Sequence, residues 1–440
     1  MSATLILFED EHAARFDPLI WTRSVGRLRL GAWTQDQRFG HLFPERRTRL
    51  LVRSALADVE RESGVDVVSP EDPGEHDTLF VAAALGRPDP ETIERLRSLE
   101  DGRALLADGR LVAARVSGPR VSRLASVLSE RLGDSLLPKA SGADTDERIL
   151  EEVGVSAHDV SLEWSLTAAD FVAANGDAID ADFDFYAPML PEPSSADHSG
   201  VHLLEPSRIR LADGVRLDPG VVLDARAGSI LLGAGTEIRA NSVITGPVVM
   251  ARDCVVKPLS RLDSGVSLGP VTRVGGEVHT SIVLGYSNKQ HDGFLGNSYV
   301  GEWVNLGAAT DTSDLRNDYG NVKLVLAGET VDTKRRSVGS LIGDHTKTAI
   351  HTRLNTGTVL GVSCNVFGSG VPPRAVPGFS WGGPGSWAEY RLDKATRVAA
   401  IVTSRREIEF TERQRRLFAA IHEETAAERH RQLGIIPTEI

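Results

Sequence analysis

Eight apolar residues recur at every sixth position in the middle of the chain. They are Leu232, Ile238, Ile244, Met250, Val256, Leu262, Leu268 and Val274. Neither a helix nor an alternating strand produces a period of six over this length. That period is typical of a hexapeptide parallel β-helix, in which each hexad forms one short strand and one corner of a coil. We therefore expect these side chains to stack inside a prism.

Two further runs have the same period. The later one is Ile342, Thr348, Leu354, Leu360 and Val366, and the earlier, weaker one is Ile209, Val215 and Val221. Chance spacing in a chain rich in glycine and valine is the alternative reading, but glycine and proline fill the gaps between the repeats as corners require. The predicted left-handed β-helix spans residues 201–370, with a longer loop near 311–336.

The first 190 residues have a different pattern. Short apolar runs predict strands at 4–8 and 78–84, and apolar positions three and four apart predict helices at 91–99 and 122–136. Alternating strands and helices indicate an α/β domain over residues 1–190 with a largely parallel sheet. Residues 191–200 have the proline-rich, small-residue composition of a linker.

The C-terminal part, residues 371–440, begins with a loop rich in glycine and proline. A charged helix is expected at 403–433, where Ile408, Leu417, Phe418 and Ile421 have helical spacing.

Composition narrows the functional classes. A chain of 440 residues suggests two or three domains, and its net charge of −12 argues against nucleic-acid binding. The two cysteines, Cys254 and Cys364, are far apart in sequence, which favours a reduced cytoplasmic compartment over a disulfide scaffold. The N-terminus turns acidic too early for a signal peptide, and no apolar run has the length of a membrane span.

The densest candidate motif lies at residues 285–310, GYSNKQHDGFLGNSYVGEWVNLGAAT. It supplies, without a gap, His291, Phe294, Leu295, Gly296 and Asn297, then Val304, Asn305, Leu306, Gly307, Ala308 and Thr310. This pattern resembles the acetyltransferase half of the bifunctional N-acetylglucosamine-1-phosphate uridylyltransferase/glucosamine-1-phosphate acetyltransferases. The resemblance implies that His291 is the general base, that Asn305 and Phe294 bind substrate, and that the Ala308 backbone lies near the thioester of acetyl-CoA.

The chemistry of acetyl transfer agrees with this assignment. Transfer from a thioester to an amine needs the amine in its neutral form, and an imidazole accepts a proton near neutral pH. Glycine-rich corners and Asn305 offer donors for the developing oxyanion. The alternative is that His291 only occupies an exposed loop.

Two later segments, 310–320 and 332–350, resemble archaeal-type sugar-1-phosphate nucleotidyltransferase/acetyltransferases. Asp314, Leu315 and Arg316 stand where that family has Asn-Leu-Arg, so its first position is changed. By the same resemblance Asn317, Tyr319 and Lys323 are expected to bind substrate. Arg335 and Arg336 are candidate ligands for the phosphates of CoA, because arginine binds phosphate in a bidentate manner, and a surface salt-bridge role is the alternative.

Arg261 lies where the uridylyltransferase family has an arginine that binds the sugar phosphate. The lysine that this family carries in the following coil is replaced by His279. The replacement puts the amino-sugar phosphate in doubt as the acceptor.

The N-terminal part resembles a branch of sugar-1-phosphate nucleotidyltransferase-like proteins. The shared residues are Leu7, Phe8, Glu9, Asp10, Pro18, Leu19, Thr22, Arg23, Val25, Leu28, Arg29 and Gly31. The glycine-rich phosphate loop of the mainstream family is absent, since no glycine lies between Ser2 and Val25. Arg23 and Arg29 are the candidate nucleotide ligands in its place.

Phosphoryl transfer also requires Mg²⁺ on carboxylates, for which Asp10, Asp177 and Asp182 are candidates without a diagnostic motif. An altered or lost activity of this domain is an equal alternative.

The leading hypothesis is an enzyme of nucleotide-sugar synthesis. It would acetylate an amino-sugar phosphate with acetyl-CoA, couple a sugar 1-phosphate to a nucleotide, and work as a homotrimer because the family's acetyl-CoA site lies between chains. Two alternatives remain. One is a zinc carbonic anhydrase using imidazoles from His279, His291, His345 and His351. The other is a non-catalytic assembly or regulatory protein.

Overall fold

The computed structural model describes residues 3–69, 74, 76–138, 145–162, 164–194 and 198–434. It divides the chain into two units. The first comprises residues 1–16, 20–28 and 33–166, and the second comprises residues 17–19, 29–32 and 167–440. The domain limits inferred from the sequence stay a prediction, and residues 195–197 of the expected linker lie outside the described residues. Within the described ranges, no helix is long and apolar enough to cross a membrane.

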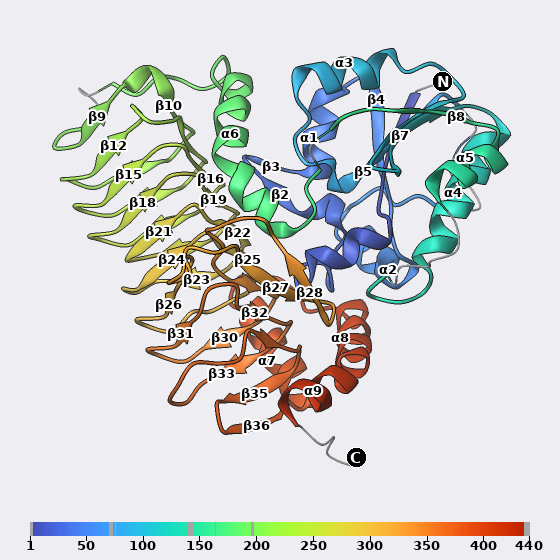
Figure 1. The fold of residues 1–440 in the computed structure, drawn as a ribbon. Coiled ribbons are helices and arrows are strands. Elements are labelled where there is room, and N and C mark those ends of the chain that lie inside the picture. Colours follow the sequence, from blue (N-terminus) through green and yellow to red (C-terminus); the bar gives the residue numbers. More distant parts are fainter. Residues whose placement is uncertain are drawn as a thin grey trace. The chain divides into compact units, whose positions relative to one another are not determined.

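The first unit is built on a six-stranded sheet (Figure 1). Its strands, in spatial order, are β4 (Arg46–Leu51), β1 (Ala3–Phe8), β5 (Thr78–Ala82), β7 (Arg110–Val116), β6 (Arg103–Ala107) and β8 (Ser156–Asp159). Strand β1 is parallel to β4 and β5, whereas β7 is antiparallel to both its neighbours. The sheet is therefore largely parallel, as expected, and β7 is the one strand of the six that runs in the opposite direction.

Helices accompany this sheet, and both helices predicted from apolar spacing are confirmed. They are α1 (Gln35–Leu42), α2 (Ser54–Glu62), α3 (Pro90–Ser98), α4 (Pro119–Leu132) and α5 (Asp146–Val153). Asp89 caps α3 by accepting a hydrogen bond from the Thr92 amide, and a proline occupies the first turn. Buried residues of α4 and α5, such as Leu124 and Leu150, share one apolar core with Phe8 and Phe80 of the sheet.

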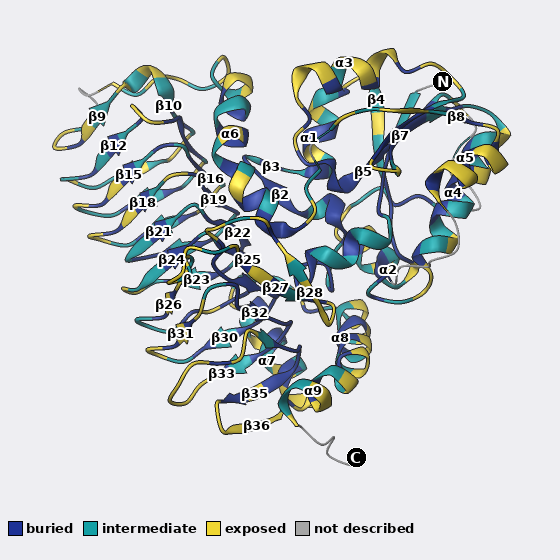
Figure 2. Cartoon of the chain, viewed as in Figure 1, coloured by how far each residue is buried: buried dark blue, intermediate teal, exposed yellow. Residues whose placement is uncertain are grey.

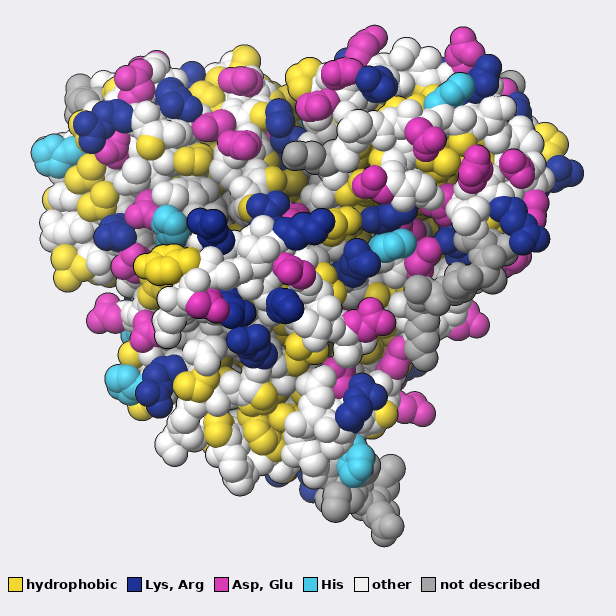
Figure 3. Space-filling model, viewed as in Figure 1, with side chains coloured by type: hydrophobic (Ala, Val, Ile, Leu, Met, Phe, Trp, Pro, Cys, Tyr) yellow, Lys and Arg dark blue, Asp and Glu magenta, His cyan; other side chains and the backbone are white. Residues whose placement is uncertain are grey.

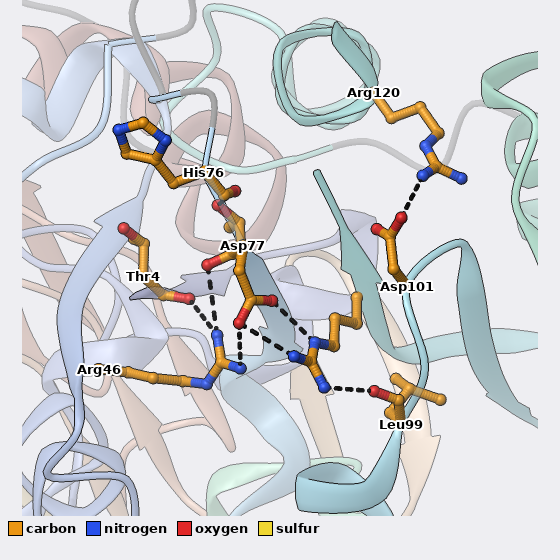
Figure 4. A network of polar contacts seen from close by, with 9 residues as sticks. Thr4, Arg46, His76, Asp77, Leu99, Asp101 and Arg120 are labelled. Atoms are coloured by element: carbon orange, nitrogen blue, oxygen red, sulfur yellow. Dashed lines mark hydrogen bonds and ion pairs between the residues drawn. The ribbon is translucent and has the colours of Figure 1, made fainter. Parts of the chain in front are cut away.

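Two arginines hold Asp77 at the amino ends of the parallel strands (Figure 4). Arg46 of β4 donates to the carboxylate at 2.9 Å, and Arg115 of β7 donates to it at 2.7 Å. The same arginines donate to the carbonyls of Thr4 and Leu99. Burial alone would raise the pKa of Asp77, but the two guanidinium groups outweigh it and lower that pKa. One carboxylate thus joins β4, β5 and β7.

At the opposite, carboxyl ends of the strands, Arg53 follows β4 with its side chain fully buried. It is paired with Glu9 at 3.1 Å and donates to the carbonyls of Ile20 at 2.9 Å and Arg23 at 3.0 Å. Glu9 in turn accepts from the Val25 amide at 2.8 Å. The segment after β1, which has no glycine-rich loop, is therefore held by one internal ion pair.

The second unit is dominated by a parallel β-helix with three faces, as the six-residue period predicts (Figure 1). The first face is a nine-stranded sheet of β10 (Ile209–Leu211), β13 (Ile230–Leu232), β16 (Val248–Met250), β19 (Val266–Leu268), β22 (Ile282–Gly285), β25 (Tyr299–Glu302), β29 (Leu341–Ile342), β32 (Val359–Leu360) and β34 (Ala375–Val376).

The second face contains β11 (Arg216–Leu217), β14 (Glu237–Ile238), β17 (Val255–Val256), β20 (Arg273–Val274) and β23 (Asn288–Lys289). A bridge at Asn305 continues it to β30 (Lys347–Thr348), β33 (Asn365–Val366), β35 (Ser380–Gly383) and the antiparallel β36 (Ser386–Glu389). The third face contains β9 (His202–Leu204), β12 (Val222–Asp224), β15 (Val243–Thr245), β18 (Arg261–Asp263), β21 (Glu277–His279) and β24 (Phe294–Gly296), followed by β26 (Asp311–Thr312) and β31 (Arg353–Leu354).

The apolar positions of the six-residue period line the interior, as predicted. The eight residues from Leu232 to Val274 are at most 1% exposed, and they belong to one core cluster (Figure 2). Ile342, Leu354, Leu360 and Val366 join the same core. Outside the prism, α6 (Ala168–Tyr186) packs Ile179 and Phe183 against residues of the first face.

The predicted interruption near residues 311–336 contains an antiparallel hairpin of β27 (Lys323–Leu326) and β28 (Glu329–Asp332). The single helix expected at 403–433 is wrong. The structure has α7 (Leu392–Ser404), α8 (Glu412–Glu424) and α9 (Ala426–Leu433). The chain breaks between α7 and α8 because Glu407 has a φ of 59° and Thr411 caps α8 together with Gln414.

Replacing Arg53 with Met should destabilise the N-terminal unit by about 3–5 kcal/mol, because it leaves the Glu9 carboxylate buried without its main partner. Urea unfolding followed by tryptophan fluorescence measures the change. The matched control is Arg47→Met, at a side chain that is 66% exposed, which should shift stability by less than about 1 kcal/mol. Equal effects of the two substitutions would contradict a stabilising role for the buried pair.

Candidate active site

His291 lies on an exposed corner of the β-helix between β23 and β24. The corner turns at Gly293, which has a φ of 119° and where an added Cβ would come within 2.4 Å of the Thr310 carbonyl oxygen. The Phe294 amide that follows donates to the Asp311 carboxylate at 2.7 Å. Among the described residues the His291 imidazole has no hydrogen-bond or ion-pair partner, so its ring nitrogens are accessible to a ligand.

The next coil brings Asn305 and Ala308 beside this corner. Asn305 forms a parallel bridge with Asn288, and the Ala309 amide donates to the Asp292 carbonyl at 2.9 Å. These contacts stack the corner of Ala308 on the corner of His291. The structure therefore brings His291, Asn305 and Ala308 together on two successive coils.

Arg261 lies on the third face, in the column of outward residues that also contains Glu277 and Phe294. Its guanidinium is paired with Glu277 at 2.7 Å and with Asp263 at 3.2 Å. Asp263 is also in close contact with Nδ1 of His279. Arg261 and His279 thus share one carboxylate, which compensates part of their charge.

The remaining predicted residues of this unit lie in the insertion between β26 and β29. Asn317, Tyr319 and Lys323 are exposed, with Tyr319 at 66%. Arg336 is exposed, whereas Arg335 donates to Asp170 of α6 at 2.7 Å. Figure 3 shows Lys and Arg side chains gathered over the region of the β27–β28 hairpin. The insertion therefore offers a cationic surface, but Arg335 is engaged in an ion pair.

Sequence reasoning missed Lys289, the residue two positions before His291. Its side chain points into the prism, in register with Val274, and the residue is only 4% exposed. Its ammonium donates to the carbonyls of Gly275, His291 and Gly293. Burial lowers its pKa to about 8. The sequence did contain a sign of this residue, because a lysine stands at an inward position of the repeat that is otherwise apolar.

A cluster of Arg273, Arg405 and Arg406 was also missed. Burial lowers the pKa of Arg406, and the charges of Arg273 and Arg405 lower it further, so both groups lie within electrostatic range of Arg406. None of the three has an ion-pair partner within the described part of the chain. Arg273 is next to Asn288 in the outward column of the second face. An uncompensated cluster of this kind attracts anions.

An aromatic ladder positions the segment that carries Arg405 and Arg406. Tyr286 stacks on Trp303 with ring centroids 4.5 Å apart, and Trp303 stacks on His345 at 6.2 Å. His345 contacts Phe410 and Phe418 edge-on at 5.7 Å and 5.1 Å. The ladder runs along the corner between the first and second faces, so it fixes residues 405–410 beside the second face. These aromatic residues lie far apart in the sequence, so their contacts could not be predicted from residue spacing.

The two predicted nucleotide ligands belong to different units. Arg23 lies in the first unit, where its carbonyl accepts from Arg53. Arg29 belongs to the second unit; its buried guanidinium donates to the Ala32 carbonyl at 2.5 Å, and burial lowers its pKa.

Two of the candidate Mg²⁺ carboxylates, Asp10 and Asp182, are engaged in other contacts. Burial alone would raise the pKa of Asp10, but His12 and Arg110 outweigh it and hold the pKa at about 2. Arg110 is 2.6 Å from the Asp10 carboxylate. Asp177 and Asp182 lie on α6, where Asp182 accepts from the Ala32 amide at 2.8 Å. Asp10 belongs to the first unit and Asp177 and Asp182 belong to the second, so the three carboxylates do not define a metal site within one unit.

More generally, the described ranges contain no group of three or more His, Cys, Asp or Glu side chains arranged to hold a metal ion. The four histidines considered for zinc are therefore not gathered within one chain. His345 is buried in the aromatic ladder, and His279 is paired with Asp263.

The chain combines an N-terminal α/β unit with a hexapeptide β-helix. Residues 5–188 match the family model of the sugar nucleotidyl transferases. This match confirms the resemblance of the N-terminal part.

The relatives align with only part of this chain. A bifunctional sugar-1-phosphate nucleotidylyltransferase/acetyltransferase of Sulfurisphaera tokodaii is 29% identical over 34% of this chain and 38% of its own length. A bifunctional protein GlmU of Azoarcus sp. is 38% identical over 24% of this chain and 23% of its own length. A solved polysialic acid O-acetyltransferase aligns at 14% identity over 43% of this chain and 87% of that chain with a TM-score of 0.23, too weak a likeness to support an inference. The chain thus spans well under two thirds of the curated relatives it matches.

Proposed function

We propose that the β-helix transfers an acetyl group from acetyl-CoA to the amine of an amino-sugar phosphate. In this reaction the amine nitrogen attacks the thioester carbonyl, a C–N bond forms and the C–S bond breaks. His291 accepts the proton that the amine loses, and the thiolate leaves as the thiol after protonation. Main-chain donors near Ala308 and the Asn305 amide stabilise the oxyanion.

The observation that carries this proposal is the stacking of the corner that carries the exposed His291 on the corner of Ala308, with Asn305 on the same coil as Ala308. Matches to bifunctional nucleotidyltransferase/acetyltransferases support it. The cluster of Arg273, Arg405 and Arg406 and the cationic insertion surface suit substrates that carry phosphate. If His291 had only a structural role, neither the Asn305 amide on the next coil nor the nearby lysine and arginine side chains would be required.

A second candidate function, coupling of a sugar 1-phosphate to a nucleotide, is favoured by the family match over residues 5–188. Arg23 is the candidate phosphate ligand that belongs to this unit. Since the candidate carboxylates do not define an Mg²⁺ site within one unit, we derive no step through that ion. An inert domain that serves assembly is the competing proposal.

We further propose a homotrimer that works in the cytoplasm. Large apolar side chains stand exposed at corners of the prism, with Leu259 at 76% and Ile350 at 68%. Such positions favour contact with neighbouring chains. The two cysteines are free and buried, which suits a reducing compartment.

Replacing His291 with Ala should lower kcat for acetyl transfer by about 10²- to 10⁴-fold, the usual contribution of a general base. Acetyl-CoA turnover against glucosamine 1-phosphate, galactosamine 1-phosphate and nucleotide-linked amino sugars measures it. Thermal stability should not change, because the side chain is exposed. The wild-type rate should rise with pH, because a general base acts only in its deprotonated form. An unchanged rate and pH profile in the variant would remove His291 from the mechanism.

Light scattering after size exclusion should give three times the 47.4 kDa mass of the chain. Replacing Leu259 and Ile350 together with Glu should shift the mass toward the monomer, because charges are costly to bury in an interface. A stable wild-type monomer with full acetyl-transfer activity would exclude the trimer proposal.

Pyrophosphate release from nucleoside triphosphates and sugar 1-phosphates tests the N-terminal unit. We expect Arg23→Ala to slow the release at least tenfold, because one charge-assisted bond to phosphate is lost, at about 1.4 kcal/mol per factor of ten. Arg29→Ala is measured beside it. If both variants match the wild type, the phosphates bind elsewhere. No release by the wild type with any nucleotide, with or without Mg²⁺, would favour the inert domain.

A further inference from the structure

A lysine occupies the interior of the prism at one coil of the second face. Lys289 is in register with Val274 below it, and the bridge of Asn288 to Asn305 aligns it with Leu306 above. Apolar Val283, Leu295 and Val300 also line the small cavity of about 10 Å³ beside it. Placing an ammonium among such side chains costs several kcal/mol unless its donors are satisfied. For packing inside the prism alone, an apolar residue would be more favourable at this position.

All three donors of the Lys289 ammonium are used. Nζ donates to the carbonyls of Gly275 at 2.8 Å, His291 at 3.1 Å and Gly293 at 2.5 Å. A lysine ammonium has three N–H donors, so the group is saturated. Two of the acceptors belong to the corner that carries His291, and the third belongs to the coil below. The lysine therefore ties this corner to its neighbour from inside the prism.

We propose that Lys289 is a positioning residue for His291, holding the backbone of the exposed corner from the interior of the β-helix. The inference rests on the proposed function, in which His291 is the base. Main-chain amides also bind this corner, since Ala309 donates to the Asp292 carbonyl and Glu277 donates to the Gly293 carbonyl, but neither bond acts on the His291 carbonyl. Gly293 adds conformational freedom at the same point. Fixing the carbonyls on both sides of Asp292 restricts the directions that the imidazole can take. Such support is valuable because a base misplaced by about 1 Å loses much of its effect.

The charge of Lys289 makes this support dependent on pH. The charged groups that face it are the carboxylates of Asp311, Asp292 and Glu277, which raise its pKa, whereas the larger effect of burial lowers the pKa to about 8. Below that pH the ammonium keeps all three donors. Above it the neutral amine has two, so one of the three carbonyls loses its bond from Nζ. Since folding lowers this pKa from 10.5 to about 8, the charged form weakens the native state fully below pH 8, and this cost is removed as the pH rises from about 8 to 10.5.

The test compares Lys289→Met with the control Ile238→Met, which places methionine at the same inward position of the same face, away from the corner. Both variants should fold, because the position accepts apolar side chains. In Lys289→Met, we expect amide hydrogen exchange over residues 290–293 to be at least tenfold faster and kcat for acetyl transfer to be about 10- to 100-fold lower, a loss usual for supporting residues. KM for acetyl-CoA should change less than about threefold. Ile238→Met should match the wild type in every measurement.

The pH profile adds a readout that packing alone would not move. The wild-type kcat should fall above an apparent pKa of about 8, and Lys289→Met should lack this fall. Wild-type exchange over residues 290–293, corrected for its intrinsic dependence on pH, should also accelerate above pH 8. This second measurement needs no variant, so it tests the positioning role of Lys289 even if Lys289→Met does not fold.

Exchange and kcat equal to those of Ile238→Met would overturn the proposal, as would wild-type exchange without a step near pH 8. Faster exchange in Lys289→Met, together with no acetyl transfer by the wild-type protein to any amino sugar, would separate the two proposals. It would support the role of Lys289 in holding the corner while the proposed function failed.

Discussion

The requirement that every coil hydrogen-bond to the coils above and below it controls the second unit. A coil can meet this requirement on three faces only if one side chain per strand points inward and the corner residues accept unusual backbone angles, as Val271 does with a φ of 60°. Residues far apart in sequence then share one outward column. Arg273, Asn288, Asn305 and Lys347 are aligned in this way on the second face. The candidate site is therefore a consequence of register, since no single segment contains it.

The N-terminal unit solves a different problem, namely how to order the segment after its first strand without glycine-rich turns. Here Arg53 provides guanidinium donors for the carbonyls of Ile20 and Arg23, while Glu9 binds the Val25 amide. A buried ion pair supports such a segment only when each partner keeps its other hydrogen bonds. The same groups that order the segment are consequently unavailable to a ligand, and this separates the unit from the family members that cradle phosphates with main-chain amides.

The sequence predicts much of this architecture, and the reasons for its failures are physical. The six-residue period identified the interior positions from Leu232 to Val274, because interior packing selects side-chain type directly. It lost register after Val274, where shorter corners place Val278 and Val283 in the core. The helix expected at 403–433 failed because Ile408 fits a helical period but lies in the break before Thr411. Local capping decided the outcome over apolar spacing.

For the candidate site, the sequence predicts that His291, Asn305 and Ala308 come together, since all three follow one register. It could not predict that Arg335 pairs with Asp170 or that Arg406 approaches Arg273, because those contacts join segments with no common period. Lys289 is instructive in this respect. A repeat built on apolar interior positions keeps a charge inside only where that charge satisfies the backbone. The charged exception to the apolar interior, Lys289, therefore lies directly beneath the corner where the chemistry is proposed. Interior residues of a repeat protein should accordingly be examined for functional roles in the same way as surface residues.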